Sequence, residues 1–252
     1  MVTWQSIFGL FDRYSRIARL YPAILAIAPC AWSAVILFPK LVTSLANSVI
    51  VVVVVIAALY FISGIARSRG KAIEPELLRR WGGWPTTIFL RHRDATLDGV
   101  TKARYQQRLS RLCGGLRFPA PDDEASDPAA ADAVYRSATK KLIEKRRDAK
   151  YRQLHYENES YGFRRNLLGL RPIAITLAAL AALGATIAWY LLTPDPRSLR
   201  DIIGFGSSYP RFPALVVVDL LDLVGWGLLV REFFVRQAAE EYAHALFRTL
   251  DA

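Results

Sequence analysis

The sequence predicts an all-helical, multi-pass membrane protein with four transmembrane helices and a helical cytoplasmic insertion between the second and third spans. Two observations support this. Of the 252 residues 53% are apolar, and the longest apolar runs lie near the two ends of the chain. The segment 67–171 holds 23 of the 33 Lys and Arg and 13 of the 22 Asp and Glu, which is +10 of the formal charge of +11. This segregation excludes a disordered tail, a collagen-like fibre and an ordinary soluble enzyme.

Four runs are long enough to cross a bilayer. Residues 20–38 and 45–66 are uncharged and give helices of about 28 and 33 Å, against a hydrocarbon core of about 30 Å. Residues 172–192 are also uncharged, and 213–230 are apolar apart from two carboxylates. A soluble chain of this length has too little polar surface to cover four such runs.

The first run also has features of a signal peptide. Arg13, Arg16 and Arg19 precede it, and Ala26-Ile27-Ala28 resembles a small-residue cleavage site. The apolar run continues to Phe38, which favours an uncleaved span.

Orientation follows from the cations near the span ends. Fifteen Lys and Arg flank the spans on one side and four on the other, which predicts that both termini and the central segment are cytoplasmic. We therefore expect a multi-pass membrane protein with cytoplasmic termini. Its expected parts are a cytoplasmic N-terminal segment (1–19), a transmembrane hairpin (20–66), a basic cytoplasmic helical domain (67–171), a second hairpin (172–230) and a cytoplasmic C-terminal helix (231–252).

Helical periodicity dominates the central segment. One helix is predicted from the spacing of Tyr105, Leu109, Leu112 and Leu116, with Asp98-Gly99 as its start signal and Gly114-Gly115 as its stop. Residues 119–128 have the composition of a loop. A second helix is predicted over about 129–156. Its apolar stripe, which includes Ala149, is narrow enough to pack against another helix, a second copy of the chain or a core.

The cations of this segment allow two interpretations. They form a solvated face that satisfies the positive-inside rule or contacts anionic lipid, or they converge on a phosphate-bearing ligand. Tyrosines and tryptophans lie among them and could stack on bases, although such residues commonly pack near a membrane surface. The candidate ligand-binding residues are Arg91, His92, Arg93, Lys140, Lys141, Lys145, Arg146, Arg147, Arg152, Arg164 and Arg165.

Asp219 and Asp222 are the candidate pore residues. They lie three positions apart inside the fourth run and so share one helix face. A carboxylate facing lipid costs on the order of 2.5 to 3.5 kcal/mol, so the pair should face a bundle interior or water. In a symmetric oligomer they would form two acidic rings of the kind that line cation pores. The alternative is a structural pair that binds an Arg or a neighbouring helix.

Other motifs are weaker. Gly204-Phe205-Gly206 echoes a potassium filter but has too short a preceding segment, and we interpret it as a turn. The stripe of small residues at 178–188 predicts close helix packing. Cys30 and Cys113 fall in an apolar run and in the polar segment, so no disulfide is expected. No HExxH, CxxC, P-loop or GxSxG motif is present, and we expect no catalytic residue, metal or cofactor.

Two blocks carry a resemblance to a known family. They are Trp81-Gly82-Gly83-Trp84-Pro85-Thr86-Thr87 with Leu90-Arg91-His92-Arg93-Asp94, and Glu157-Asn158-Glu159-Ser160-Tyr161-Gly162-Phe163-Arg164-Arg165-Asn166-Leu167. Between them lie further matching positions, Pro128, Ala131-Asp132, Tyr135 and Arg147-Asp148. With these the chain resembles the membrane effectors of Hailong-type bacterial anti-phage defence systems, over about the central third and its flanking spans.

The resemblance implies a homotetrameric ion channel. It also implies DNA oligomers, made by a partner nucleotidyltransferase, that bind the channel and hold it shut until infection removes them. The residues alone support less, namely a membrane oligomer with a basic cytoplasmic region and buried carboxylates. Two rivals remain: a non-conducting membrane anchor or scaffold whose basic segment binds anionic lipid or a protein, and a membrane enzyme with a site assembled from scattered groups.

Overall fold

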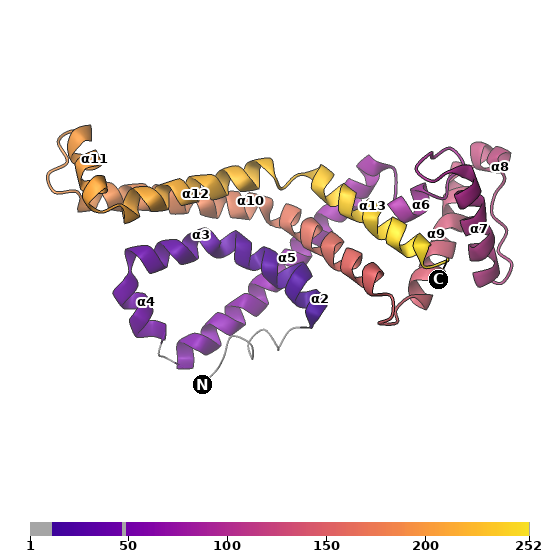
Figure 1. Ribbon diagram of the computed structural model, residues 1–252, viewed down its shortest axis with the longest axis horizontal. Helices are drawn as coiled ribbons and strands as arrows, with labels where there is room; N and C mark the ends of the chain where they lie inside the picture. Colours follow the sequence, from indigo (N-terminus) through magenta and orange to yellow (C-terminus); the bar gives the residue numbers. More distant parts are fainter. Residues whose placement is uncertain (1–11, 47–48, 252) are drawn as a thin grey trace. The chain divides into compact units, whose positions relative to one another are not determined.

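The computed structural model describes residues 12–46 and 49–251, and every regular element among them is a helix (Figure 1). Close packing divides the chain into two units. The apolar unit comprises Met1–Ala72 and Gly162–Phe234, and the polar unit comprises Ile73–Tyr161 and Val235–Ala252. The helices are α2 (Arg13–Ser15), the π-helix η1 (Arg16–Leu20), α3 (Tyr21–Leu37), α4 (Pro39–Ala46), α5 (Val49–Trp81), α6 (Pro85–Ile88), α7 (Gly99–Leu112), α8 (Pro121–Ser126), α9 (Pro128–Lys145), α10 (Arg152–Leu192), α11 (Leu199–Ser208), α12 (Arg211–Leu228) and α13 (Glu232–Arg248).

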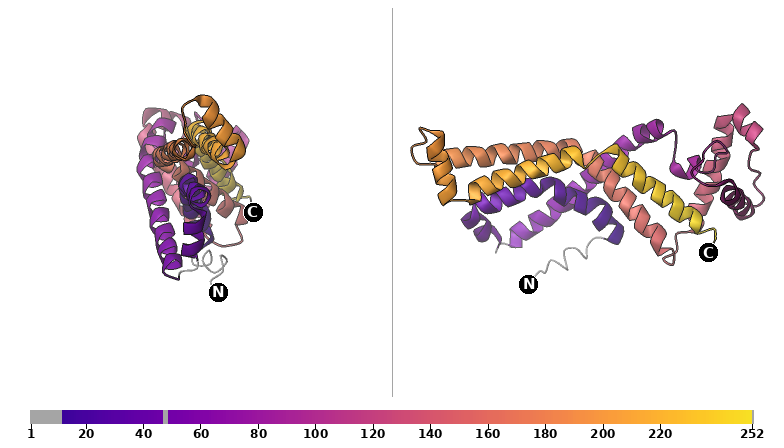
Figure 2. Two further views of the ribbon diagram at one scale, coloured as in Figure 1. Left: turned by 90° about the vertical axis from the view of Figure 1, so that its left-hand side faces the viewer. Right: turned by 45° about the horizontal axis from the view of Figure 1, so that its top comes forward.

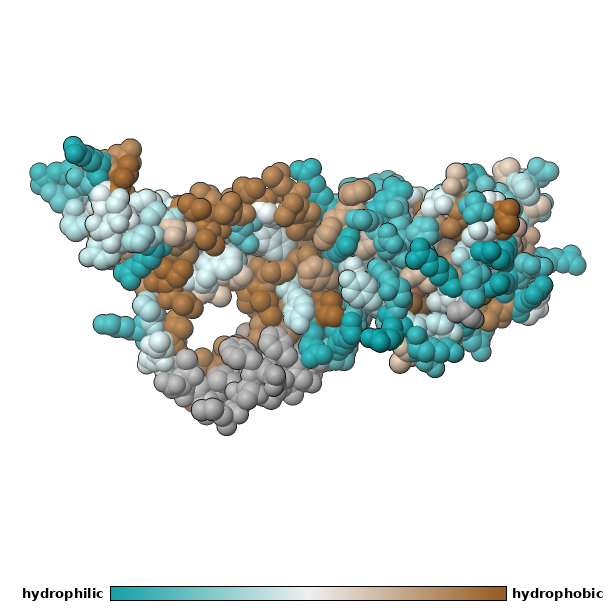
Figure 3. All heavy atoms as spheres, in the orientation of Figure 1, coloured by the Kyte–Doolittle hydropathy of each residue, from teal (hydrophilic) through white to brown (hydrophobic). Residues whose placement is uncertain are grey.

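Three to four helices are long and apolar enough to cross a membrane. Three candidates stand alone: Arg13–Leu37, Val53–Ile88 and Arg152–Leu192. Arg211–Leu228 qualifies only together with Glu232–Arg248, across a break where the two are bent by 59°. Figure 3 shows apolar residues gathered over the helices of the apolar unit. The described residues are thus all-helical, and they hold the four candidate spans that the sequence predicts only if the bent pair is one span.

Glycines bring α5 and α10 into backbone contact. A Cβ atom on Gly169 would lie 2.5 Å from the backbone nitrogen of Gly70, so only glycine permits this crossing. Beside it, the buried Asn166 side chain donates a 2.6 Å hydrogen bond to the carbonyl of Ala18 in η1. A π-helix shifts backbone carbonyls out of the regular helical hydrogen-bond pattern, and here the Asn166 side chain donates to the Ala18 carbonyl of the π-helix.

Helices α10 and α12 run alongside one another (Figures 1 and 2). Arg171 on α10 donates to the carbonyls of Trp226 and Gly227, at 3.1 and 2.8 Å, and so satisfies groups that the end of α12 leaves unpaired. Four alanines of the predicted small-residue stripe are buried: Ala178, Ala181, Ala182 and Ala185. Gly184 of the same stripe is exposed.

The polar unit has its own core, to which the C-terminal segment contributes. Large buried side chains come from four parts of the chain: Leu90, Leu109, Tyr135, Leu142, Leu246 and Phe247. The narrow stripe of the second predicted helix is therefore buried in a core within the chain. The sequence-based division treated 231–252 as a separate part, whereas packing places Val235–Ala252 in this unit.

Helix α7 confirms its sequence signals. The Asp98 carboxylate accepts a 2.8 Å hydrogen bond from the Thr101 amide, which caps the helix. Gly114 and Gly115 have φ values of 70° and 88°, a region that favours glycine and ends the helix.

Three expectations for local structure were wrong. Residues 119–128 are not simply a loop, because Pro121–Ser126 form α8, with proline in the first turn and three acids beside the positive end of its dipole. The Gly204-Phe205-Gly206 segment is not a turn but part of α11, which Ser198 and Asp201 cap reciprocally.

The third is the predicted helix 129–156, which is broken. Helix α9 ends at Lys145 and α10 begins at Arg152. Between them the Asp148 carboxylate accepts a 2.8 Å hydrogen bond from the Lys150 amide, an Asx-type turn. Ala149, expected on the apolar stripe, is exposed.

Candidate functional site

Asp219 lies fully buried on α12 and is bonded to α3. Its carboxylate accepts hydrogen bonds from the indole Nε1 of Trp32 at 2.5 Å and from the Ser33 hydroxyl at 3.4 Å. Both donors come from a single turn of α3, which also packs against α12. Asp219 therefore joins two apolar helices, as the structural alternative for this residue describes.

Asp222 lies one turn further along α12 and differs from Asp219. Its oxygen Oδ2 is buried and has no hydrogen-bond partner among the described residues. A buried polar atom without a partner carries the full cost of its lost hydration. Oδ2 thus lacks a partner in the described part of the chain, while the Asp222 carboxyl interacts with the side chain of Trp226 one turn further along α12.

The basic candidates between Lys140 and Arg152 lie on α9, in the turn after it and at the start of α10, rather than along one helix. Lys140, Lys141 and Lys145 are on α9, Arg146 and Arg147 lie in the turn, and Arg152 begins α10. Lys141 and Lys145 therefore do not share a helix face with Arg152, because α9 ends at Lys145 and α10 begins at Arg152. All of these except Arg146 are exposed. With Lys150 they form the basic turn, which we define as Lys140, Lys141, Lys145, Arg147, Lys150 and Arg152.

Arg146 is held inside the polar unit. Its guanidinium donates to the hydroxyl and the carbonyl oxygen of Thr249, at 3.1 and 3.2 Å, and stacks over Tyr151 with 5.0 Å to the ring centroid. Lys150 approaches the same ring at 5.1 Å. Tyr151 thus fixes two cations in the turn, and Arg146 also links the turn to the C-terminal segment.

The Arg91-His92-Arg93 triplet makes contacts within the chain. Arg91 is buried and donates two hydrogen bonds to Asp132, at 2.8 and 2.7 Å. It also donates to the carbonyl of Gly82, which lies in the glycine turn with φ 80°. Such a bidentate pair aligns the turn after α5 with α9 and leaves little of Arg91 available to a ligand.

His92 and Arg93 surround a buried acid. The carboxylate of Glu124 accepts hydrogen bonds from the His92 amide at 2.7 Å and from the Tyr135 hydroxyl at 2.6 Å. The Arg93 guanidinium lies 4.0 Å from it. His92 Nε2 lies 2.9 Å from the Pro119 carbonyl, and since a carbonyl only accepts, this nitrogen carries a proton.

Arg164 and Arg165 pack within the apolar unit. Arg164 donates to the carbonyl of Phe234 at 3.1 Å and stacks on its ring at 4.3 Å, while Arg165 is buried. The structure does not bring these two or the triplet together with the basic turn into one described site. Within the polar unit, only the basic turn remains an exposed group of candidates.

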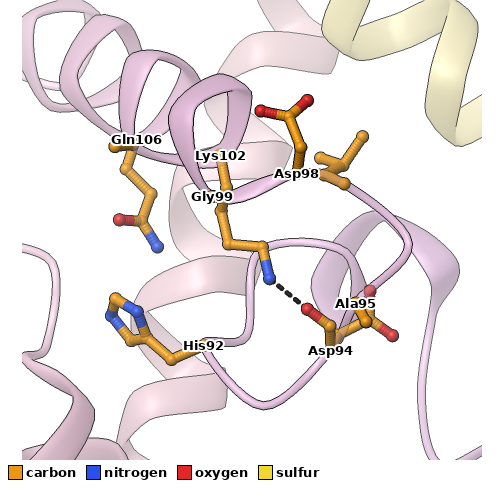
Figure 4. Close-up of a pocket in the computed structure, with 9 residues that line it drawn as sticks. His92, Asp94, Ala95, Asp98, Gly99, Lys102 and Gln106 are labelled. Atoms are coloured by element: carbon orange, nitrogen blue, oxygen red, sulfur yellow. Dashed lines mark hydrogen bonds between the residues drawn. The ribbon is translucent and has the colours of Figure 1, made fainter.

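One pocket of about 360 Å³ lies in the polar unit beside the start of α7 (Figure 4). It is lined by His92, Asp94, Ala95, Leu97, Asp98, Gly99, Lys102, Ala103 and Gln106. The buried Lys102 ammonium donates to the carbonyls of Arg91, at 2.6 Å, and Asp94. Sequence reasoning missed Lys102 and Glu124, because a single charge within a helix or loop carries no signal of burial.

Two further observations concern reactive groups. Cys30 and Cys113 are free thiols, and partial burial raises the pKa of Cys113, which disfavours the reactive thiolate. Among residues 12–46 and 49–251, no three His, Cys, Asp or Glu side chains are grouped so that they could hold a metal ion.

Comparisons of the chain with known protein families, curated proteins and solved structures find no match.

Proposed function

We propose that the chain is a subunit of an oligomeric membrane channel whose path for inorganic cations passes Asp222 and Asp219. The observation that carries the proposal is the buried, unpartnered Oδ2 of Asp222, one turn from Asp219 in a helix whose other residues after Arg211 are uncharged. A membrane anchor needs neither carboxylate, since each opposes insertion by on the order of 2.5 to 3.5 kcal/mol. A hydrated ion path around an oligomer axis would supply water and cations to the unpaired oxygen.

The proposal gives the two acids different roles. Asp219 receives its hydrogen bonds from Trp32 and Ser33 and holds α12 against α3. Asp222 is the residue that interacts with the permeating ion.

The first test is ion flux through the reconstituted protein. Asp222→Asn keeps the size of the side chain and removes its charge, so we expect cation flux into liposomes to fall with protein abundance unchanged. Asp195→Asn, at an exposed position outside the candidate spans, is the matched control and should conduct like the parent. Equal flux in all three proteins would remove Asp222 from the ion path, and flux no greater than that of protein-free liposomes would overturn the channel and favour the non-conducting anchor.

We further propose that a polyanion bound at the basic turn controls the channel. Its six cations all lie within 13 residues, from Lys140 to Arg152 through the α9–α10 break, and the only acids in that interval are Glu144 and Asp148. The resemblance adds that the ligand is a DNA oligomer or other nucleotide, that the channel is a tetramer of the bacterial inner membrane, and that the system serves anti-phage defence.

The second test measures binding of a labelled DNA oligonucleotide to the detergent-solubilised full chain. Each phosphate neutralised releases counterions, so affinity should fall steeply with salt. Lys145→Glu with Lys150→Glu should weaken binding and reduce the salt slope. Arg111→Glu with Arg117→Glu changes the net charge equally at exposed positions outside the turn and should retain most of the affinity. An equal loss in both pairs would show attraction by net charge rather than a site in the basic turn.

A further inference from the structure

The short helix α11, between two candidate spans, is held at a fixed rotation. The indole Nε1 of Trp189, on α10, donates a 3.1 Å hydrogen bond to the carbonyl of Ile202. A Cβ atom on Gly206 would lie 2.5 Å from the same indole, so the backbone of α11 rests on this ring. These contacts fix the face of α11 that is turned toward the end of α10.

Aromatic stacking holds α11 to the start of α12 as well. The Phe205 ring lies 5.7 Å from that of Phe212 and 4.6 Å from that of Tyr209, measured between centroids. Since α11 is attached to the ends of both neighbouring helices, it lies at the level where they end.

A second, outward stripe of α11 is apolar and uncovered. Leu199 and Ile203 lie one turn apart and expose 72% and 55% of their surface. Asp201 and Ser208, on the opposite side of α11 from Leu199, are also exposed, so the helix has apolar and polar sides. Large apolar side chains exposed in a row on one helix indicate a surface that another apolar phase covers.

The surroundings indicate that this phase is lipid. Tyr190, which follows Trp189 in the chain, and Tyr209, which packs on Phe205, are both half exposed, and this is the aromatic composition of a membrane interface. Arg200 and Arg211, both exposed, supply charges suited to lipid phosphates. At the same end of the unit α4 also exposes two leucines one turn apart, Leu41 at 57% and Leu45 at 44% (Figure 1).

We propose that α11 lies in the headgroup layer of a phospholipid bilayer, with Leu199 and Ile203 inserted between the acyl chains and Arg200 at the phosphates. An amphipathic helix in this position binds the membrane surface without crossing it. The two spans that flank α11 are thereby held at a set depth. The inference is independent of whether the protein conducts ions.

The test places an environment-sensitive fluorophore on single cysteines in a background of Cys30→Ser and Cys113→Ser. The reporter position is Ile203→Cys, and the control is Ser208→Cys, which is exposed and lies on the far side of the helix from Leu199. Each variant is reconstituted in phosphatidylcholine and phosphatidylglycerol vesicles. The fold is intact after labelling if each labelled variant has the helical circular dichroism spectrum and the elution volume of the parent.

Two quenchers then distinguish the possible surroundings. We expect lipids brominated near the headgroup to quench the Ile203 label and aqueous iodide to spare it, with the reverse for the Ser208 label. Equal iodide quenching at both positions would overturn the proposal, because α11 would then lie in water. Protection from iodide without quenching by bromolipid would also overturn it, since a protein surface would then cover Ile203.

Discussion

A buried acid shows how single residues in a basic segment acquire their roles. Glu124 accepts hydrogen bonds from the Tyr135 hydroxyl and the His92 amide, and its carboxylate lies beside Arg93. The sequence marks His92 and Arg93 as anion donors. In the structure the anion beside them is a side chain of the same protein, because Glu124 on α8 packs against the loop that carries His92 and Arg93.

Glu124 should make stability depend on pH. Burial alone would raise the pKa of Glu124, but hydrogen bonds from Tyr135 and from the His92 and Arg93 amides outweigh burial and lower the pKa below its ordinary 4.5. A lowered folded-state pKa contributes stability that is present above the unfolded-state pKa and is lost as pH falls through the folded value. We expect the thermal midpoint of the solubilised protein to drop as pH falls below about 4.5.

Glu124→Gln should cost about 1 to 3 kcal/mol at neutral pH, because it removes a charged acceptor from buried donors. It should also flatten the acid side of the profile. Glu144→Gln, at an exposed position on α9, should match the parent throughout. Identical acid profiles for the parent and Glu124→Gln would assign the pH dependence to other groups.

The residues around Asp219 mark the limit of sequence reasoning. The energetic cost of a carboxylate in an apolar run identifies Asp219 and Asp222 from the sequence alone. Their partners do not follow from it. Trp32 lies 187 positions from Asp219, and no local pattern links an indole in the first apolar run with a carboxylate in the fourth.

Among the elements, those with local start and stop chemistry were predictable. Helix α7 follows from Asp98 and the two glycines, since the cap and the positive φ act within a few residues. The break after α9 was not predictable from periodicity. Leu142 and Leu154 are both buried in one core, so the chain must reverse between them, and this requirement is tertiary. The signal for α11 was present in Ser198 and Asp201, a capping pair.

The crossing of α5 and α10 yields a prediction at this scale. Gly169→Ala would place a Cβ atom 2.5 to 2.8 Å from backbone atoms of Arg69 and Gly70, which cannot rotate away. The two helices must separate, so we expect a clear fall in the thermal midpoint in detergent, consistent with overpacking costs of about 1 to 3 kcal/mol.

Gly184→Ala on the same helix is the matched control. A Cβ atom there meets nothing within 4 Å, and alanine in a helix interior is favoured over glycine by about 0.5 to 1 kcal/mol. The control should match or exceed the parent in stability. A Gly169→Ala protein as stable as Gly184→Ala would show that the close crossing is absent in solution.

At the scale of the whole molecule, the shared core constrains the topology. The polar unit buries Leu90 and Tyr135 with Leu246 and Phe247 from the far end of the chain. A single core cannot lie on both sides of a bilayer, so segment 162–234 must leave the unit and return to the same side. If α10 crosses the membrane, α12 must therefore cross back. This argues for four spans, although α12 is long and apolar enough to cross only when it is taken together with α13.

Reporter fusions test this parity and the predicted orientation together. The count of fifteen cations against four predicts that the polar unit is cytoplasmic. A reporter that is active only in the cytoplasm should therefore be active when fused after Ala252 and inactive when inserted between Thr193 and Ser198, the connection before α11. A second reporter, active only outside, should give the opposite pattern. Activity of one reporter at both positions would show that α12 does not return across the membrane, and would remove Asp219 and Asp222 from any transmembrane ion path.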